Sequence, residues 1–148
     1  MYDMMCEQLK ALSEGVTWWV TQLSNASALI YQSMDRLNWA GFYLMKDGKL
    51  ELGPFQGKVA CTTIPVGKGV CGTAVAEKRT IRVEDVHQFP GHIACDSASN
   101  SEIVIPIWKK GEIIGVLDID SPVTHRFSEE DEAGLTAFVK VLEEILAL

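Results

Sequence analysis

Three of the four cysteines in this chain stand where a thiol could take part in chemistry. Cys95 lies in a polar stretch, where a thiol gains little from packing and can reach solvent or a ligand. Cys61 falls in an apolar run that predicts a strand, so core packing explains it as well as chemistry does. Cys71 falls in a glycine-rich segment that predicts a turn, whereas Cys6 belongs to a predicted helix and is interpreted as structural.

A zinc site is one alternative for these thiols. Positions 61, 71 and 95 are too widely spaced for a compact zinc motif. His92 and Cys95, with His87 nearby, could still supply two or three ligands if the fold brings them together. The spacing does not favour a metal, and a chain with so few cysteines predicts reduced thiols rather than a disulfide scaffold.

Two carboxylates stand close together farther along the chain. Asp118 and Asp120 flank Ile119 at the end of an apolar run that predicts a strand, so alternation places both on one face. Such a pair repels unless a cation lies between the two groups or one carboxyl takes up a proton at a raised pKa. The alternative is that they mark the solvated end of the strand, where Ser121-Pro122 begins a turn.

Other polar and aromatic residues are ambiguous by pattern alone. Glu102 opens the neighbouring predicted strand, and Trp39 and Tyr43 lie four positions apart, on one face of an earlier one. The aromatic pair could belong to the core or could form the wall of a pocket for a small ligand.

The elements that position these residues follow from periodicity and turn signals. The first third is predicted to be helical and to form one helix, because it carries an apolar stripe with helical spacing. The stripe consists of Val16, Val20, Leu23, Ser27, Ile30 and Met34. Two strands from Trp39 to Phe55 are expected to form a hairpin around Asp47-Gly48. The next predicted elements are a strand Ala60 to Val66, a break at Gly67, Gly69 and Gly72, a short helix Thr73 to Lys78 and a strand Thr80 to Val86.

The second half begins with the longest irregular segment, His87 to Ser101, where we expect chemistry. The runs Glu102 to Trp108 and Glu112 to Asp120 predict a second hairpin across Lys110-Gly111. Ser128 is expected to cap a final helix with an acidic first turn. The predicted buried face of that helix is Leu135, Phe138, Val139, Leu142, Ile145 and Leu146.

This order of elements predicts an α+β fold, a mostly antiparallel sheet covered by the N- and C-terminal helices. A chain of 148 residues with 47% apolar residues closes one hydrophobic core, so a single domain over residues 1–148 is expected. The net charge of -7 and the lack of a basic patch argue against a nucleic-acid partner. The N-terminus lacks the basic start of a secretory signal and no run approaches the roughly 18 apolar residues of a membrane span, so a cytoplasmic location is expected.

Six motifs together resemble the free methionine-(R)-sulfoxide reductases, and the match runs from about Gly15 onward. They are Asn38-Trp39-Ala40-Gly41-Phe42-Tyr43, Leu52-Gly53-Pro54-Phe55-Gln56-Gly57, Gly69-Val70-Cys71-Gly72-Thr73-Ala74, Gly91-His92-Ile93-Ala94-Cys95-Asp96, Ser101-Glu102-Ile103-Val104 and Gly115-Val116-Leu117-Asp118-Ile119-Asp120-Ser121. The resemblance implies a GAF fold, which more often binds small effectors than catalyses, and here implies an enzyme because all three cysteines of the reductases have counterparts.

The resemblance also assigns roles to residues. Cys95 corresponds to the attacking cysteine, Cys61 to the resolving one and Cys71 to a third, auxiliary one. The implied pocket residues are Trp39, Tyr43, Glu102, Asp118 and Asp120.

The implied reaction converts free L-methionine (R)-S-oxide to L-methionine. The Cys95 thiolate attacks sulfur while Glu102 or Asp120 donates to the oxygen, and the resulting sulfenic acid condenses with Cys61 to give a disulfide. Asp118 is expected to pair with the substrate ammonium, and Trp39 with Tyr43 to pack the S-methyl group.

Thioredoxin is the implied reductant, since a dithiol can attack the disulfide by exchange. The chain has no flavin, nicotinamide or metal motif, so no cofactor is expected and the reducing equivalents come from outside the chain. A homodimer is a further implication of the family resemblance. The alternative function is a non-catalytic GAF sensor that binds a small molecule or reports oxidation through a reversible disulfide.

Overall fold

A computed structural model describes residues 1–93, 95 and 97–148; Ala94 and Asp96, part of the motif around Cys95, lie outside the described residues. Its centre is one six-stranded sheet in the order β3-β2-β1-β6-β5-β4, in which every neighbouring pair is antiparallel. The strands are β1 (Trp39–Lys46), β2 (Lys49–Gly57), β3 (Thr63–Pro65), β4 (Ile81–Val83), β5 (Ser101–Lys109) and β6 (Glu112–Ser121).

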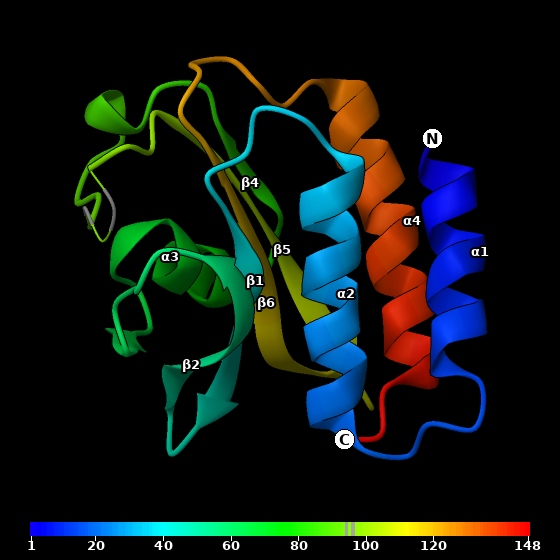
Figure 1. The fold of residues 1–148 in the computed structure, drawn as a ribbon. Coiled ribbons are helices and arrows are strands. Elements are labelled where there is room, and N and C mark those ends of the chain that lie inside the picture. Colours follow the sequence, from blue (N-terminus) through cyan, green and yellow to red (C-terminus); the bar gives the residue numbers. More distant parts are fainter. Residues whose placement is uncertain (94, 96) are drawn as a thin grey trace.

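Helices cover both faces of this sheet, as Figure 1 shows. On one face lie α2 (Trp19–Ser33) and α4 (Glu129–Ile145), and α1 (Tyr2–Ser13) packs against these two helices. On the opposite face lies the short helix α3 (Gly69–Glu77), beside the long loop that leads into β5. The expected α+β arrangement, an antiparallel sheet with the terminal helices packed together on it, is confirmed.

The alternation of side chains along the strands separates two apolar clusters. Leu117 and Ile119 of β6 belong to the cluster under the terminal helices, together with Phe138 and Leu142 of α4. Val116, by contrast, belongs to the cluster on the α3 face. The same alternation places Asp118 and Asp120 on one face, as the sequence predicts, and the structure shows that this is the α3 face.

Both predicted hairpins and the predicted helix cap are present. Asp47 and Gly48 adopt positive φ angles of 53° and 77°, and the Lys110-Gly111 turn has the same form. Ser128 accepts a hydrogen bond from the Asp131 amide, and Asp131 completes a capping box. Of the predicted buried face, Ile145 is half-buried, and Leu146 is buried but follows the end of α4.

Four predictions of local structure are wrong. The first third contains two helices rather than one, because the chain turns at Gly15 (φ 73°) before α2 begins. The strand predicted from Ala60 is only β3, three residues pairing with the edge of β2, so Cys61 precedes it. The strand predicted from Thr80 to Val86 is likewise only β4, because pairing with β5 stops at Val83 and a 3₁₀ helix, Val86–Gln88, follows.

The fourth correction concerns Cys71, which lies in helix α3 and not in a glycine-rich turn. Gly72, interpreted as a break, lies inside that helix and donates its amide to the carbonyl of Lys68. A Cβ at Gly72 would collide with the carbonyl oxygen of Pro65. Glycine is needed there for close packing against β3, and it does not end the helix.

None of the helices in the described residues is both long enough and apolar enough to cross a membrane.

Candidate active site

A pocket opens on the α3 face of the sheet, where β1 and β5 begin and β6 ends. It is lined by seven of the eight predicted site residues: Trp39, Tyr43, Cys71, Cys95, Glu102, Asp118 and Asp120. The eighth, Cys61, is joined to Cys95 by a disulfide, with the two Cα atoms 5.5 Å apart. The fold therefore brings together residues from β1, α3, β5 and β6 and from the two loops that carry Cys61 and Cys95.

Strand register places the carboxylates beside one another. Asp120 of β6 is paired with Glu102 of β5 on one side and with Trp39 of β1 on the other. Asp118, two residues earlier on the same face, is paired with Val104 and Gly41. The three acids therefore lie close together at one end of the antiparallel strands β5 and β6.

Burial dominates the electrostatics of these acids. Desolvation by burial raises the pKa of Glu102 and of Asp120 well above the ordinary range, and the neighbouring Asp118 charge raises both further. Burial also raises the pKa of Asp118, but hydrogen bonding to Glu102, Asp120 and Cys71 opposes that shift. Asp118 is therefore the acid of the three that ionises most readily, and the other two keep a proton to higher pH.

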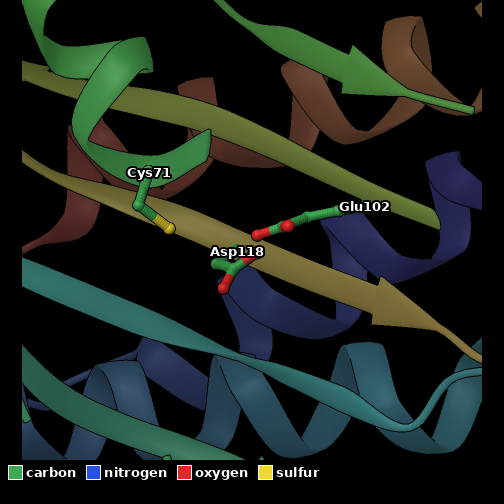
Figure 2. Close-up of side chains that lie close together, drawn as sticks. All are labelled: Cys71, Glu102 and Asp118. Atoms are coloured by element: carbon green, nitrogen blue, oxygen red, sulfur yellow. The ribbon is translucent and has the colours of Figure 1, made fainter. Parts of the chain in front are cut away.

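The thiol of Cys71 belongs to the same cluster. Figure 2 shows Cys71 on α3 pointing toward Glu102 and Asp118 on the sheet. Sγ of the cysteine and one carboxylate oxygen of each acid lie within 4.8 Å of one another. Burial and then the Asp118 charge raise the pKa of this thiol well above its ordinary value. A protonated buried thiol is a weak nucleophile.

Three aromatic rings stack beside the pocket, and two of them, Trp39 and Tyr43, line it. Trp39 stacks on Tyr43 with ring centroids 5.8 Å apart, and on Phe55 with centroids 5.2 Å apart. Glycine makes room for the indole, because a Cβ at Gly41 or Gly57 would lie within 3 Å of the Trp39 side chain.

The polar tips of these aromatics hold the segment that carries Cys61. The Trp39 indole donates to the Lys58 carbonyl at 3.1 Å, and the Tyr43 hydroxyl donates to the Cys61 carbonyl at 2.9 Å. Burial and then the charge of Asp118 raise the pKa of Tyr43, so its hydroxyl stays a donor. Tyr43 thereby links the pocket wall to the backbone of one cysteine of the disulfide.

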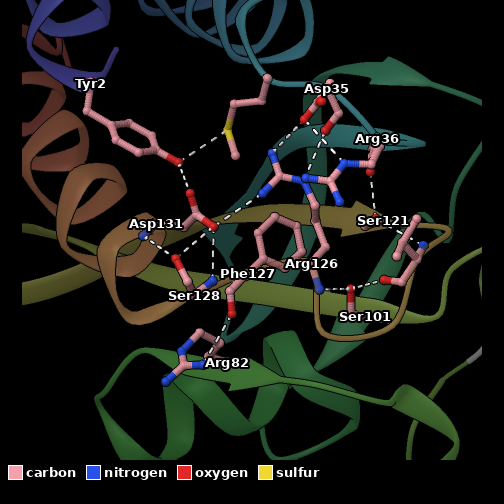
Figure 3. A network of polar contacts seen from close by, with 12 residues as sticks. Tyr2, Asp35, Arg36, Arg82, Ser101, Ser121, Arg126, Phe127, Ser128 and Asp131 are labelled. Atoms are coloured by element: carbon pink, nitrogen blue, oxygen red, sulfur yellow. Dashed lines mark hydrogen bonds and ion pairs between the residues drawn. The ribbon is translucent and has the colours of Figure 1, made fainter.

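A second group of polar contacts fixes the strand ends that carry the acids, as Figure 3 shows. Ser101, next to Glu102, donates its hydroxyl to the Val123 carbonyl, and Ser121, next to Asp120, donates to the Arg36 carbonyl at 2.6 Å. Arg126 donates its amide to the Ser101 hydroxyl at 3.4 Å. These contacts tie the loop after β6 to the start of β5.

The described residues do not assemble the alternative zinc site of His87, His92 and Cys95. His87 contacts Asn100, with Nε2 3.0 Å from Oδ1, and does not line the pocket. His92 does line the pocket, with Nε2 3.9 Å from Oε1 of Glu102, but Cys95 is held in the disulfide. Cys6 lies on α1 against the other apolar cluster, beyond the sheet from the pocket.

Sequence reasoning missed three contributors to the site. Phe55 stacks on Trp39, His92 lines the pocket beside Glu102, and Lys68 lines it at the start of α3. His92 was considered only as a zinc ligand; burial and then His87 lower its pKa, which favours the neutral ring. The glycine-rich signal before α3 marked the Lys68 region, but it did not show which residues face the pocket.

This chain is similar to proteins of a known family. The GAF domain family model matches residues 8–146. The chain is 58% identical to the free methionine-R-sulfoxide reductase of Escherichia coli (strain K12), over 99% of this chain and 88% of that protein.

Solved structures give the same grouping. The structure of fRMsr of Staphylococcus aureus in complex with substrate is 54% identical, with a TM-score of 0.94 over 99% of this chain and 95% of that one. The free methionine-R-sulfoxide reductase from Neisseria meningitidis, in complex with its substrate, is 42% identical, with a TM-score of 0.94 over 98% and 87%. The chain therefore belongs to the GAF domain family and, within it, to the free methionine-R-sulfoxide reductases.

Proposed function

We propose that this protein reduces free L-methionine (R)-S-oxide to L-methionine by means of its own cysteine thiols. One observation carries the proposal: the Cys61–Cys95 disulfide adjoins a pocket that also holds carboxyl groups with raised pKa values. That combination supplies a nucleophile, a resolving thiol and a proton donor within one small space. The E. coli relative, 58% identical to this chain, is named a free methionine-R-sulfoxide reductase.

The first step needs an acid as well as a thiolate, because a sulfoxide sulfur is a poor electrophile until its oxygen is protonated or strongly hydrogen bonded. Glu102 and Asp120 are the candidates for that acid, since burial keeps both protonated at higher pH than an ordinary carboxyl. The Cys95 thiolate attacks the sulfur, the oxygen is transferred to Cys95 and methionine leaves. Cys95 is then a sulfenic acid.

The second step closes the disulfide. The Cys61 thiol attacks the sulfenic sulfur of Cys95, the S–S bond forms, and the oxygen departs as water with the two available protons. The structure corresponds to this oxidised state, because Cys61 and Cys95 are bonded while Cys71 stays a free thiol. We assign Cys71 an auxiliary role, since burial keeps its thiol protonated.

The remaining pocket residues orient the amino acid. Asp118, the most readily ionised acid of the three, pairs with the substrate ammonium, a group that a methionine residue inside a polypeptide lacks. The Trp39 and Tyr43 rings pack the S-methyl group and so discriminate between sulfoxide epimers. Selectivity for the free R-sulfoxide follows from these two contacts together.

Regeneration requires a dithiol from outside the chain. Thioredoxin, whose dithiol would attack the Cys61–Cys95 disulfide by exchange, is our proposed reductant in a reducing cytoplasm. The balance of one cycle is sulfoxide plus dithiol to methionine, water and oxidised thioredoxin. No cofactor is needed for that balance, and one GAF domain over residues 1–148 suffices for it.

The test compares turnover of free L-methionine R- and S-sulfoxides by the protein and by Cys95→Ser, with thioredoxin or dithiothreitol as reductant. We expect methionine to form only from the R epimer and only with Cys95 present. Cys6→Ser, which removes a thiol on the far side of the sheet, is the matched control and should keep full activity. Binding of the sulfoxide without turnover by the reduced, folded protein would instead support a GAF sensor.

A further inference from the structure

The pocket contains a second constellation, in which Cys71, a thiol that the proposed reaction does not consume, lies beside two of the acids that the reaction uses. Sγ of Cys71, one carboxylate oxygen of Glu102 and one of Asp118 lie within 4.8 Å of one another. They come from three different elements, α3, β5 and β6, and all three side chains point to a common centre in Figure 2. Cys71 remains free when Cys61 and Cys95 are bonded, so the constellation survives in the oxidised protein.

These three side chains are buried, and among the described residues neither acid pairs with a lysine or an arginine. Cys71, Glu102 and Asp118 are 4%, 7% and 5% exposed. The nearest basic group in the part of the chain that the structure describes is His92, 3.9 Å from Glu102. The Asp118 carboxyl takes part in hydrogen bonds with Glu102, Asp120 and Cys71, but its buried Oδ1 has no hydrogen-bond partner among the described residues. A buried carboxylate oxygen without a partner is costly, and a cation bound beside it would offset that cost.

We propose that Cys71, Glu102 and Asp118 form a binding site for a divalent cation of borderline softness, Zn²⁺ in particular. One thiolate and two carboxylates suit zinc, whereas magnesium and calcium select sites made of oxygen ligands alone. Ligand atoms bound to one tetrahedral zinc lie closer together than 4.8 Å, so the cluster contracts by up to roughly 1 Å as the metal enters. Three protein ligands would leave a fourth position of a tetrahedral zinc for water or another ligand in the pocket.

Zinc would take the place of protons in this site. The Cys71 thiol loses its proton to become the thiolate ligand, and each carboxyl that is protonated beforehand loses one as well. Metal affinity therefore rises with pH as these groups deprotonate. A further consequence rests on the proposed function: zinc held here occupies the sulfoxide pocket and blocks the reductase.

The test uses the oxidised protein, in which Cys6 and Cys71 are the free thiols and no reductant is present to chelate the metal. Zn²⁺ is titrated in a calorimeter in two buffers of different ionisation enthalpy. We expect one equivalent to bind with release of protons to the buffer, and Mg²⁺ at the same concentration not to bind. Replacing one ligand by Cys71→Ala should weaken zinc binding by about 10- to 100-fold or more, since even groups behind the ligands have effects of that size.

Cys6→Ala is the matched control, because it removes the other free thiol and should leave the titration unchanged. Asp118→Asn provides a second ligand variant if Cys71→Ala proves unstable, and it should lose affinity in the same way. The proposal is overturned if the oxidised protein binds no Zn²⁺, or if both ligand variants bind it as tightly as the parent. Either result leaves the proposed reductase intact, because its assay contains no zinc and depends on Cys95.

Discussion

Two groups of acids in this molecule differ in how they are balanced. Asp131, at the start of α4, has its carboxylate contacted by Arg126 at 3.2 Å, by the Ser128 amide at 2.9 Å and by the Tyr2 hydroxyl at 2.6 Å (Figure 3). Glu102 and Asp118 in the pocket have no such arginine and no backbone donor among the described contacts. The Asp131 carboxylate has its hydrogen-bond and charge partners within the fold, whereas the pocket acids can still accept a partner from a ligand.

The pKa values follow this difference. The backbone and side chain of Ser128, the Tyr2 hydroxyl and the Arg126 charge lower the pKa of Asp131 against the opposing effect of burial. Burial and like charges raise the pKa of Glu102. A carboxyl group therefore stabilises the fold where hydrogen-bond donors and an arginine face it, and it keeps its proton in the pocket where they do not.

Removing an acid from the pocket is expected to give the largest effect. Glu102→Gln keeps the shape but cannot donate an acidic proton, so kcat should fall by about 10²- to 10⁴-fold, the usual contribution of a positioned acid. Methionine formation under saturating sulfoxide measures this loss. An unchanged kcat would leave Asp120 as the proton donor.

The same variant should gain stability, which sharpens the contrast with Asp131. A raised folded pKa contributes stability that is fully present below the unfolded pKa, about 4.3 for Glu, and is lost as pH rises through the folded pKa. Glu102→Gln removes that loss. In urea titrations, the free energy of unfolding of the variant should therefore exceed that of the parent by an amount that grows with pH. Glu84→Gln, which alters an exposed acid, should show no such trend.

Removing the arginine beside Asp131 should damage the fold and spare the chemistry. The Arg126 side chain is only 7% exposed, and it contacts both Asp131 and Asp35. Arg126→Ala should therefore lower the free energy of unfolding by about 3 kcal/mol, as for other broken buried pairs. Denaturant unfolding measures this change, with kcat below the transition close to that of the parent.

Arg36→Ala is the matched control, because Arg36 also pairs with Asp35 but both side chains are largely exposed. Exposed pairs contribute about 0–1 kcal/mol, so this variant should remain near the parent. Equal losses for the two arginines would contradict the idea that Arg126 is special.

The next smaller effect distinguishes substrate binding from catalysis within the pocket. Asp118→Asn removes the charge proposed to pair with the substrate ammonium, so KM should rise by about 10- to 100-fold, the value of a charged hydrogen bond. The fall in kcat should be smaller than the rise in KM. An unchanged KM would remove this assignment from Asp118.

Much of the fold, but only part of the site, could be predicted from the sequence. Strand alternation and hairpin turns depend on residues that are close in sequence. The common face of Asp118 and Asp120 and the turn at Asp47-Gly48 could therefore be predicted. Gly72 was misinterpreted because its purpose, close packing against Pro65, is a tertiary contact with no local pattern. The fate of a buried acid likewise depends on donors from distant segments, such as Tyr2 for Asp131.

The smallest predicted effect concerns Asp131 and has the opposite sign in pH from that of Glu102. A lowered folded pKa contributes stability that is present above the unfolded pKa, about 3.9 for Asp, and is lost as pH falls through the folded pKa. Asp131→Asn keeps an acceptor oxygen but loses the charge, so it should cost about 1 kcal/mol near neutral pH, within the range for cap substitutions. This deficit should shrink toward zero in acid, when the parent aspartate is itself protonated. Thermal unfolding followed from neutral to acidic pH measures it, and a deficit that stays constant would mean that Asp131 acts through shape alone and that charge does not separate the two groups of acids.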